Sequence, residues 1–540
     1  MAIPFFNKTQ NDATWSLKYL ERPWAPDRES ILEFLAAHAS PKSDEDLDPP
    51  MLPDESWLTD MRSIRFAPGV FDRMMRVNET ADQAYRQAHD VIADVRDLSL
   101  RSASSGLAKL HEAITRRRMS EVLEVLEEDL SETKFARPDR VRQIAMLLIR
   151  ESPDRDAVKV GLLLLGNTGL DPADAADVVL VGSHGEFSRF AVPALQGKVD
   201  GWRQLAWAMA KRVEGPARAE AVMALAGAPE PEICQWLLEE GWRDNSYDDG
   251  AAFVCATTGG LETALRDGTI SLEAAGGLLR SLSAAEIFHH PGLRQLPNGP
   301  DIVERYVRQM AASEQALWQF AIARSMHLFA TSKYKNWEED PAPGWTPEVR
   351  AHIAEVCAQI LRLPGWEDMV HQALLNPDAE ERGDAYEVAH LRHMDLWEHW
   401  WGLAQSDPGF EEWTRLASHV TAARVDSFLR LADERLNFEL ESDSRHIEIV
   451  AGALGRFPGK GTHFVYEALG HENRGAWDAI RVLDRWGSAN WNAEIMSRMK
   501  ILAREHPLPR YREPLRQLLD GSFRPPDPIP LDDEPELWET

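Results

Sequence analysis

Apolar residues recur at helical spacing along most of this 540-residue chain. From residue 136 onward, segments of about 10 to 15 residues with one apolar face alternate with short turns. The segments 141–149 and 221–225 are examples. The alternation of apolar and polar positions that is typical of strands is not sustained anywhere. The pattern therefore predicts an all-α protein built from successive antiparallel helical hairpins.

Several of these segments begin with signals for a helix start. A proline at the first helical position gives up an amide that would be unpaired anyway, and a preceding polar side chain caps the next free amides. Ser283 with Glu286 also has the spacing of a capping box. The polar-proline pairs that fit are Ser152-Pro153, Asp171-Pro172, Thr346-Pro347, Asn376-Pro377 and Asp407-Pro408. One two-helix unit takes about 35 residues, as in helical-repeat solenoids, so we predict a solenoid over residues 136–521.

The region before the solenoid, residues 67–135, has a different pattern. Apolar positions follow one another at alternating steps of three and four, which is a heptad seam on one long helix. We expect this helix to pack against the next predicted helix, Leu107 to Leu130, as a long hairpin; the alternative is a seam between two copies of the chain. The seam positions are Phe71, Met74, Asn78, Ala81, Tyr85, Ala88, Ile92 and Val95.

Both ends of the chain differ from the repeats. Residues 1–66 contain many prolines and an acidic stretch at 43–48, which predicts an irregular segment with one short helix around Arg28 to Ala39. Residues 522–540 contain five prolines, and acidic residues follow the first four. They hold too few apolar groups to offset the entropy of ordering, so we expect a disordered acidic tail.

Charge narrows the range of partners. The net charge of −29 comes from 88 acidic against 59 basic residues, which would repel a nucleic acid backbone. We therefore expect no nucleic acid partner, and we expect a protein or peptide partner to be basic. Three cysteines form no disulfide framework, and neither a signal peptide nor an apolar segment long enough for a bilayer occurs. These features predict a cytoplasmic protein without a membrane partner.

Candidate catalytic motifs do not rise above chance. Four acid-x-x-His pairs occur, but 17 His and 88 acidic residues make that number unremarkable, so no di-iron site is indicated. The segment 455–462 has the glycines of a phosphate loop but the wrong spacing. The sequence thus supports no catalytic residue, no metal ligand and no cofactor.

One aromatic patch is unusually dense. His393, Trp397, Trp400 and Trp401 fall at i, i+4, i+7 and i+8, on one side of a predicted helix, and Trp413 follows soon after. Packing between neighbouring hairpins explains such a patch, and a binding groove on the surface is the alternative. Tryptophan is enriched in binding hot spots, so these five residues are the candidate binding site.

Two segments resemble a known family. Residues 229–265, which begin Pro-Glu-Pro-Glu-Ile-Cys-Gln-Trp, and residues 469–486 are similar to bacterial HEAT-repeat proteins, some of which carry the name limonene hydroxylase. The resemblance implies a HEAT-like α-solenoid. For the members with that name it also implies a monooxygenase, whose oxygen chemistry needs a haem, flavin or iron.

The expected function is therefore a non-enzymatic scaffold that binds a protein or peptide on the solenoid surface. The alternative is a limonene hydroxylase-like monooxygenase, an oxidoreductase, as the resemblance implies. A third hypothesis is an acidic mimic of nucleic acid.

Overall fold

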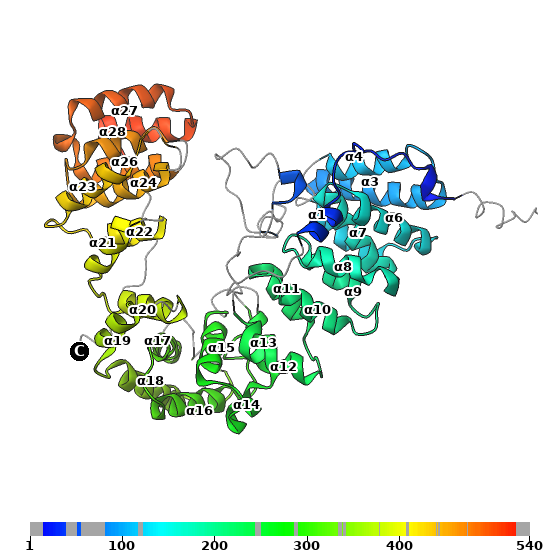
Figure 1. Ribbon diagram of the computed structural model, residues 1–540, viewed down its shortest axis with the longest axis horizontal. Coiled ribbons are helices and arrows are strands. Elements are labelled where there is room, and N and C mark those ends of the chain that lie inside the picture. Colours follow the sequence, from blue (N-terminus) through cyan, green and yellow to red (C-terminus); the bar gives the residue numbers. More distant parts are fainter. Residues whose placement is uncertain are drawn as a thin grey trace, which may run out of the picture. The chain divides into compact units, whose positions relative to one another are not determined.

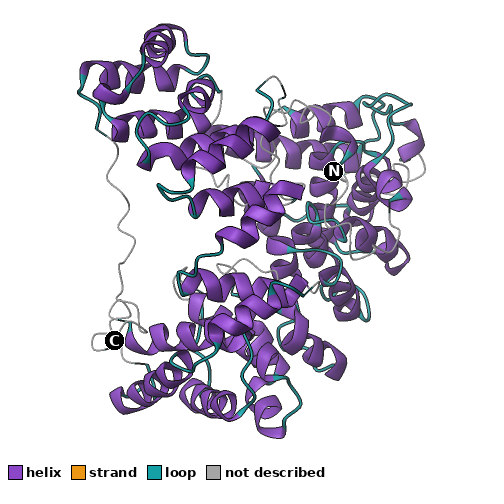
Figure 2. Cartoon of the chain, turned by 60° about the vertical axis from the view of Figure 1, so that its left-hand side comes forward, coloured by secondary structure: helices purple, strands orange, loops and turns teal. Residues whose placement is uncertain are grey.

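The chain is all-α in the part that the computed structural model describes. That part comprises residues 15–38, 51–55, 68, 81–116, 122–243, 250–285, 290–332, 337, 342–376, 379–406, 410–438, 440, 443–471 and 474–524. Within these residues there are 27 α-helices and no strand (Figure 1 and Figure 2). The predicted fold class is confirmed at this level. None of the described helices is both long and apolar enough to cross a membrane.

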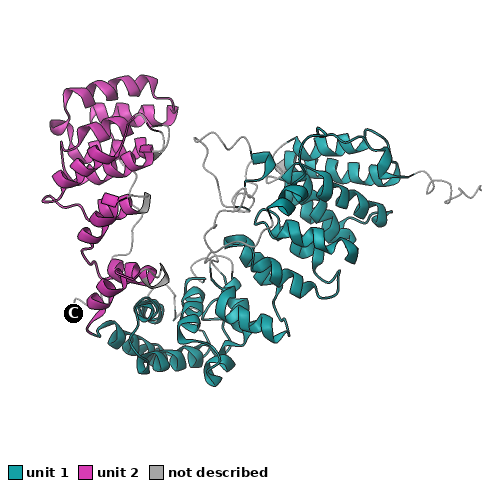
Figure 3. Ribbon diagram, in the orientation of Figure 1, with its two compact units in different colours: residues 1–363 teal, residues 364–540 magenta. Residues whose placement is uncertain are grey.

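The chain divides into two compact units, residues 1–363 and 364–540 (Figure 3). The helices of the first unit are α1 (Ile31–Ala37), α3 (Ala81–Leu100), α4 (Gly106–Thr115), α5 (Leu123–Glu132), α6 (Pro138–Glu151), α7 (Arg155–Thr168), α8 (Ala175–Gly182), α9 (Ser188–Leu195), α10 (Trp202–Ala210), α11 (Gly215–Ala224), α12 (Pro231–Trp236), α13 (Ala251–Gly259), α14 (Leu261–Asp267), α15 (Leu272–Ala285), α16 (Gly299–Ala312), α17 (Trp318–Thr331) and α18 (Pro347–Leu361). Those of the second unit are α19 (Trp366–Ala373), α20 (Ala379–Leu391), α21 (Trp397–Ser406), α22 (Phe410–Ser418), α23 (Val425–Arg435), α24 (Ser444–Ala453), α25 (Thr462–Ala468), α26 (Arg474–Trp486), α27 (Ala493–Glu505) and α28 (Arg512–Asp520).

Many of the described helices contact the next helix along the chain, the next but one, or both. In the first unit α7, α9, α11, α13, α15 and α17 touch in succession, while α6, α8 and α10, and then α14, α16 and α18, form runs of their own. In the second unit α22, α24, α26 and α28 form such a run. Packing is close enough for small residues to matter: a Cβ added to Gly161 of α7 would lie 2.8 Å from the Ala145 carbonyl oxygen of α6. Successive helices thus bury their apolar faces against each other.

Only some of the helix starts that were predicted from capping residues are observed in the structure. Thr346 caps α18 by accepting a hydrogen bond from the Val349 amide at 3.4 Å, with Pro347 as the first helical residue. Asp171 caps the 3-10 turn η4 (Pro172–Asp174) in the same way. The predicted start at Ser283 is wrong, because Ser283 lies inside α15 and its hydroxyl donates to the Arg280 carbonyl. The Ser-x-x-Glu spacing of a capping box also occurs by chance within helices. There the serine hydroxyl donates to a carbonyl of the preceding turn.

The second helix of the predicted long hairpin is broken. This helix, predicted over Leu107 to Leu130, is two helices, α4 and α5. Both contact α3, and both also contact α7. Seam residues Ala88, Ile92 and Val95 are buried in α3, whereas Tyr85 is 51 % exposed. The seam therefore packs within the chain from Ala88 onward, and its positions before Ala81 lie outside the described residues.

The N-terminal segment holds the expected short helix. This is α1, where Ser30 and Glu33 form a reciprocal capping box. The α1 helix packs on α6 and α8. The acidic stretch at 43–48 and residues 525–540 of the predicted tail lie outside the described residues.

A buried ion pair ties α7 to the turn before α9. The Lys159 ammonium, in a residue only 1 % exposed, lies 2.5 Å from a Glu186 carboxylate oxygen. Arg155, one helical turn earlier, pairs with the same carboxylate and with Asp54 and Glu55 of the N-terminal segment. A charge buried here needs its counter-charge, because desolvation is otherwise uncompensated.

We predict that Glu186→Gln destabilises the α7–α9 region by about 3 to 5 kcal/mol, because it leaves the Lys159 ammonium buried opposite a neutral amide. Amide hydrogen exchange of α7 peptides would measure the loss locally, without assuming that both units unfold together. The matched control is Glu304→Gln, which breaks the exposed i,i+4 pair with Arg308 and should change stability by less than about 0.5 kcal/mol. Equal effects of the two substitutions would contradict the prediction.

Candidate functional site

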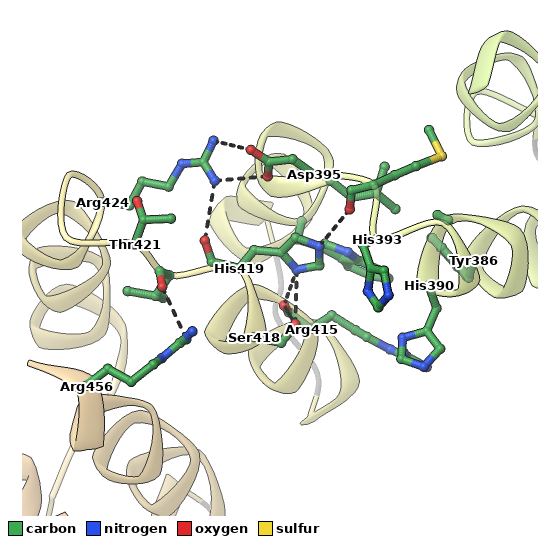
Figure 4. A pocket seen from close by; sticks show the side chains of 15 residues that line it. Tyr386, His390, His393, Asp395, Arg415, Ser418, His419, Thr421, Arg424 and Arg456 are labelled. Atoms are coloured by element: carbon green, nitrogen blue, oxygen red, sulfur yellow. Dashed lines mark hydrogen bonds and ion pairs between the residues drawn. The ribbon is translucent and has the colours of Figure 1, made fainter. Parts of the chain in front are cut away.

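An open pocket of about 360 Å³ lies in the second unit, where the connections between successive helices meet (Figure 4). Its lining comes from α20, the connection from α20 to α21, α21 itself, α22, the connection from α22 to α23, and the 3-10 turn η8 (Leu454–Arg456). The lining residues are Tyr386, Ala389, His390, His393, Met394, Asp395, Leu396, Trp400, Arg415, Ser418, His419, Val420, Thr421, Arg424 and Arg456.

The aromatic side of the pocket is a stack on α20 and α21. The rings of Tyr386 and Trp400 stack with centroids 4.7 Å apart, and the Trp400 residue is 3 % exposed. The Tyr386 hydroxyl lies 2.9 Å from Nε2 of His399, whose ring meets Trp400 edge-on. Burial, together with the nearby charge of Arg382, lowers the pKa of His399. The neutral ring is thereby favoured, and its Nε2 can accept a hydrogen bond from the Tyr386 hydroxyl.

A salt bridge joins the two connections. The Arg424 guanidinium donates to both carboxylate oxygens of Asp395, at 2.9 and 2.7 Å, and lies over the Trp397 ring. Asp395 also accepts from the Trp397 amide, so it caps the start of α21. The hydrogen bond from Arg424 lowers the pKa of Asp395, and the same bond raises the pKa of Arg424. Both groups therefore stay charged at neutral pH.

His419 joins the connection before α21 to the end of α22. Its Nδ1 lies 2.9 Å from the Arg415 carbonyl oxygen, and its Nε2 lies 3.3 Å from the Met394 carbonyl oxygen. Arg415 extends from α22 toward the α20 side of the pocket (Figure 4). The ring thus holds two backbone segments together at the edge of the pocket.

Arg456 enters the pocket from a third segment. It is exposed, and it donates to the Val420 carbonyl oxygen at 3.2 Å. The η8 turn that carries it is held by the buried Trp486 indole, which donates to the Leu454 carbonyl at 2.7 Å. The position of Arg456 therefore depends on the packing of α26 against η8.

The predicted aromatic patch is divided between the pocket and the core. His393 and Trp400 line the pocket, whereas Trp397, Trp401 and Trp413 are not among its lining residues. Trp397 stacks on Trp401 with centroids 5.2 Å apart. Trp413 is completely buried and packs on Phe428 of α23. Packing therefore accounts for Trp413, while a binding role for the other four stays a prediction.

The predicted helical spacing of His393 is wrong. The α21 helix begins at Trp397, and His393 lies in the preceding connection with a φ of 50°. The Met394 amide bonds back to the Ala389 carbonyl at 2.9 Å, which closes the end of α20. A left-handed residue is the usual way to end a helix, although it is uncommon for histidine. The chain therefore reverses within the run that spacing alone assigned to one helix.

Sequence reasoning missed the basic side chains of the pocket. Arg415 lies in α22, His419 and Arg424 lie in the connection that follows it, and Arg456 lies in η8. The acidic surplus along the whole chain gives no hint of this basic group. His390 was visible only as part of an acid-x-x-His pair that occurs by chance. No spacing rule brings these residues together, because the pocket depends on how three helix connections stack.

The pocket offers hydrogen-bond donors and cationic groups, and the Ser418 hydroxyl in its lining donates to the Arg415 carbonyl and lies 3.0 Å from Nδ1 of His419. Its one carboxylate, Asp395, is engaged by Arg424. The three cysteines lie elsewhere; burial raises the pKa of Cys357 to about 12 and that of Cys255 further still. Among the described residues no group of three or more His, Cys, Asp or Glu side chains could hold a metal ion. The arrangement therefore suits binding of a negatively charged group.

The chain matches no protein-family model, no curated protein and no solved structure. Of what the HEAT-repeat resemblance implies, the all-helical architecture is thus shown, and the family itself stays a prediction.

We predict that His399 makes the second unit less stable in acid. The pKa of His399 is lowered by folding, so its stabilising contribution is present above the ordinary imidazole pKa of about 6.5 and is lost as the pH falls through the lowered value. The half-exposed ring limits the effect to less than about 1 kcal/mol.

His399→Gln keeps an acceptor for Tyr386 but does not titrate. Amide exchange of α20 and α21 peptides, with both proteins compared at the same pH, should show wild type losing protection relative to the variant on acidification. A constant difference between the two proteins at every pH would refute the role of His399.

Proposed function

We propose that this chain is a HEAT-like α-solenoid that binds a protein or peptide partner and catalyses no reaction. The observation that carries the proposal is the pocket of the second unit, which is open to solvent and lined by the connections of successive helices. Helical-repeat proteins commonly bind partners across surfaces formed in this way. The runs of contacts between alternate helices support the same architecture.

The composition of the pocket supports peptide binding. The half-buried Tyr386 ring, which stacks on the buried Trp400, offers aromatic surface beside the hydrogen-bond donors of Arg415 and Arg456. Aromatic and arginine side chains are the ones that most often dominate binding energy at protein interfaces. A peptide presents apolar and polar groups together, so it can use both kinds of contact.

Long-range electrostatics would then favour basic partners over most of the surface. The chain carries 88 acidic and 59 basic residues, and such a surplus speeds encounter with positively charged proteins at low salt. The cytoplasm is the compartment that we propose. The monooxygenase alternative is not favoured by any contact in the described residues.

A peptide library panned on the purified full-length chain tests the proposal. We expect enriched peptides to bind saturably at one site per chain, with Kd values in the micromolar range, about −8 kcal/mol. Amide-exchange footprinting should show protection in α20, α22 and their connections. Binding of basic peptides should weaken as the salt is raised from about 0.05 M to about 0.5 M, because screening shortens the range of the charges.

Two results would overturn the proposal. One is the absence of saturable binding by any enriched peptide. The other is a haem, flavin or iron present at about one per chain in the purified protein, shown by absorption spectroscopy and metal analysis, which would favour the monooxygenase instead.

A further inference from the structure

The pocket of the second unit is lined by more positive than negative charges, whereas the chain as a whole is acidic. Asp395 is the single acidic residue of its lining, and Arg424 engages it at 2.7 Å. Six basic or titratable side chains share the same lining. They are Arg415, Arg424, Arg456, His390, His393 and His419. With all the histidines neutral the lining still carries two more positive than negative charges, in a chain whose net charge is −29.

Arg456 has donors to offer a ligand. It is exposed, and among the described residues its one hydrogen bond is the donation from Nη2 to the Val420 carbonyl. A guanidinium carries five N–H donors in a planar fork that matches a carboxylate. The Arg424–Asp395 pair shows this bidentate geometry within the pocket itself. A second carboxylate could be bound by Arg456 in the same way.

His419 lies at the edge of the pocket among polar groups. Its Nδ1 is 2.9 Å from the Arg415 carbonyl oxygen and 3.0 Å from the Ser418 hydroxyl, and its Nε2 is 3.3 Å from the Met394 carbonyl oxygen. The Arg424 guanidinium donates to the His419 carbonyl oxygen at 3.4 Å. His419 therefore helps to hold the lining of the pocket in place.

We propose that this pocket binds a carboxylate of an acidic peptide, with Arg456 as the principal contact and Arg415 beside it. The inference rests on the proposed peptide-binding function and names the chemistry of the anchoring group. The Tyr386 ring, supported by the buried Trp400, would contact the apolar part of the residue that carries the carboxylate. The acidic surface elsewhere repels such a peptide, so the pocket selects acidic groups locally rather than by long-range attraction.

Three labelled peptides of identical length test the inference by fluorescence anisotropy with the full-length chain. One contains Asp and Glu, the second contains Asn and Gln at the same positions, and the third contains Lys there. The acidic peptide should bind at least about tenfold more tightly than its amide counterpart, since a charge-assisted hydrogen bond is stronger than a neutral one.

Three variants test whether Arg456 is responsible for the tighter binding of the acidic peptide. Arg456→Gln should weaken binding of the acidic peptide about tenfold. Arg456→Lys, which keeps the charge but not the planar fork, should lose less. Arg430→Gln is the matched control, because Arg430 is exposed on the neighbouring α23 and does not line the pocket. Amide exchange of α24 and α26 peptides would verify that each variant keeps the native packing of η8.

The outcomes separate the two proposals. If only the Lys peptide binds, or if Arg456→Gln and Arg430→Gln behave alike, the acidic-peptide inference fails while peptide binding stands. If no peptide binds, both fail. If inorganic phosphate displaces the acidic peptide while acetate does not, the pocket recognises phosphate, and the carboxylate inference is overturned.

Discussion

The structure depends on helices that share their apolar faces with two sets of neighbours. A single amphipathic hairpin of the lengths found here cannot bury enough apolar surface to be stable by itself. In runs such as α7–α9–α11–α13 and α22–α24–α26–α28, each helix packs on the helix two positions earlier in the chain. More apolar surface is buried in this way than within one hairpin. The core is consequently continuous within a unit, and the ends of the helices form its edges. Side chains for binding are then available mainly where the connections emerge.

The candidate site follows from that arrangement. Its residues belong to helix connections and to the neighbouring turns of α20, α21 and α22, and three contacts hold these segments in place. Arg424 bridges to Asp395, His419 lies between the Arg415 and Met394 carbonyls, and Trp486 fastens the turn that carries Arg456. Each of these contacts joins segments that are 25 to 32 residues apart in the chain. The pocket is therefore a product of the stacking of helices that are not adjacent in sequence.

Buried charge in the first unit illustrates a different use of ionic groups. Lys159 and Glu186 are almost completely buried, and Arg155 extends the network to the N-terminal segment at Asp54 and Glu55. Such pairs contribute little net stability, but they penalise any arrangement that separates them. They therefore help to determine which segment packs on α7. In the second-unit pocket, by contrast, Arg456 is exposed and its charge is accessible to a ligand.

The sequence by itself determined the all-α class, the start of α18 at Pro347 and the buried part of the α3 seam, because each depends on neighbours within a few turns of one helix. It could not determine that the run from His393 to Trp401 is broken, since a left-handed residue at His393 leaves no trace in apolar spacing. Nor could it show that Trp413 belongs to the core or that Arg415, Arg424 and Arg456 meet. Those facts depend on contacts between residues far apart in the chain, and only the stacking of successive helices decides which residues come together.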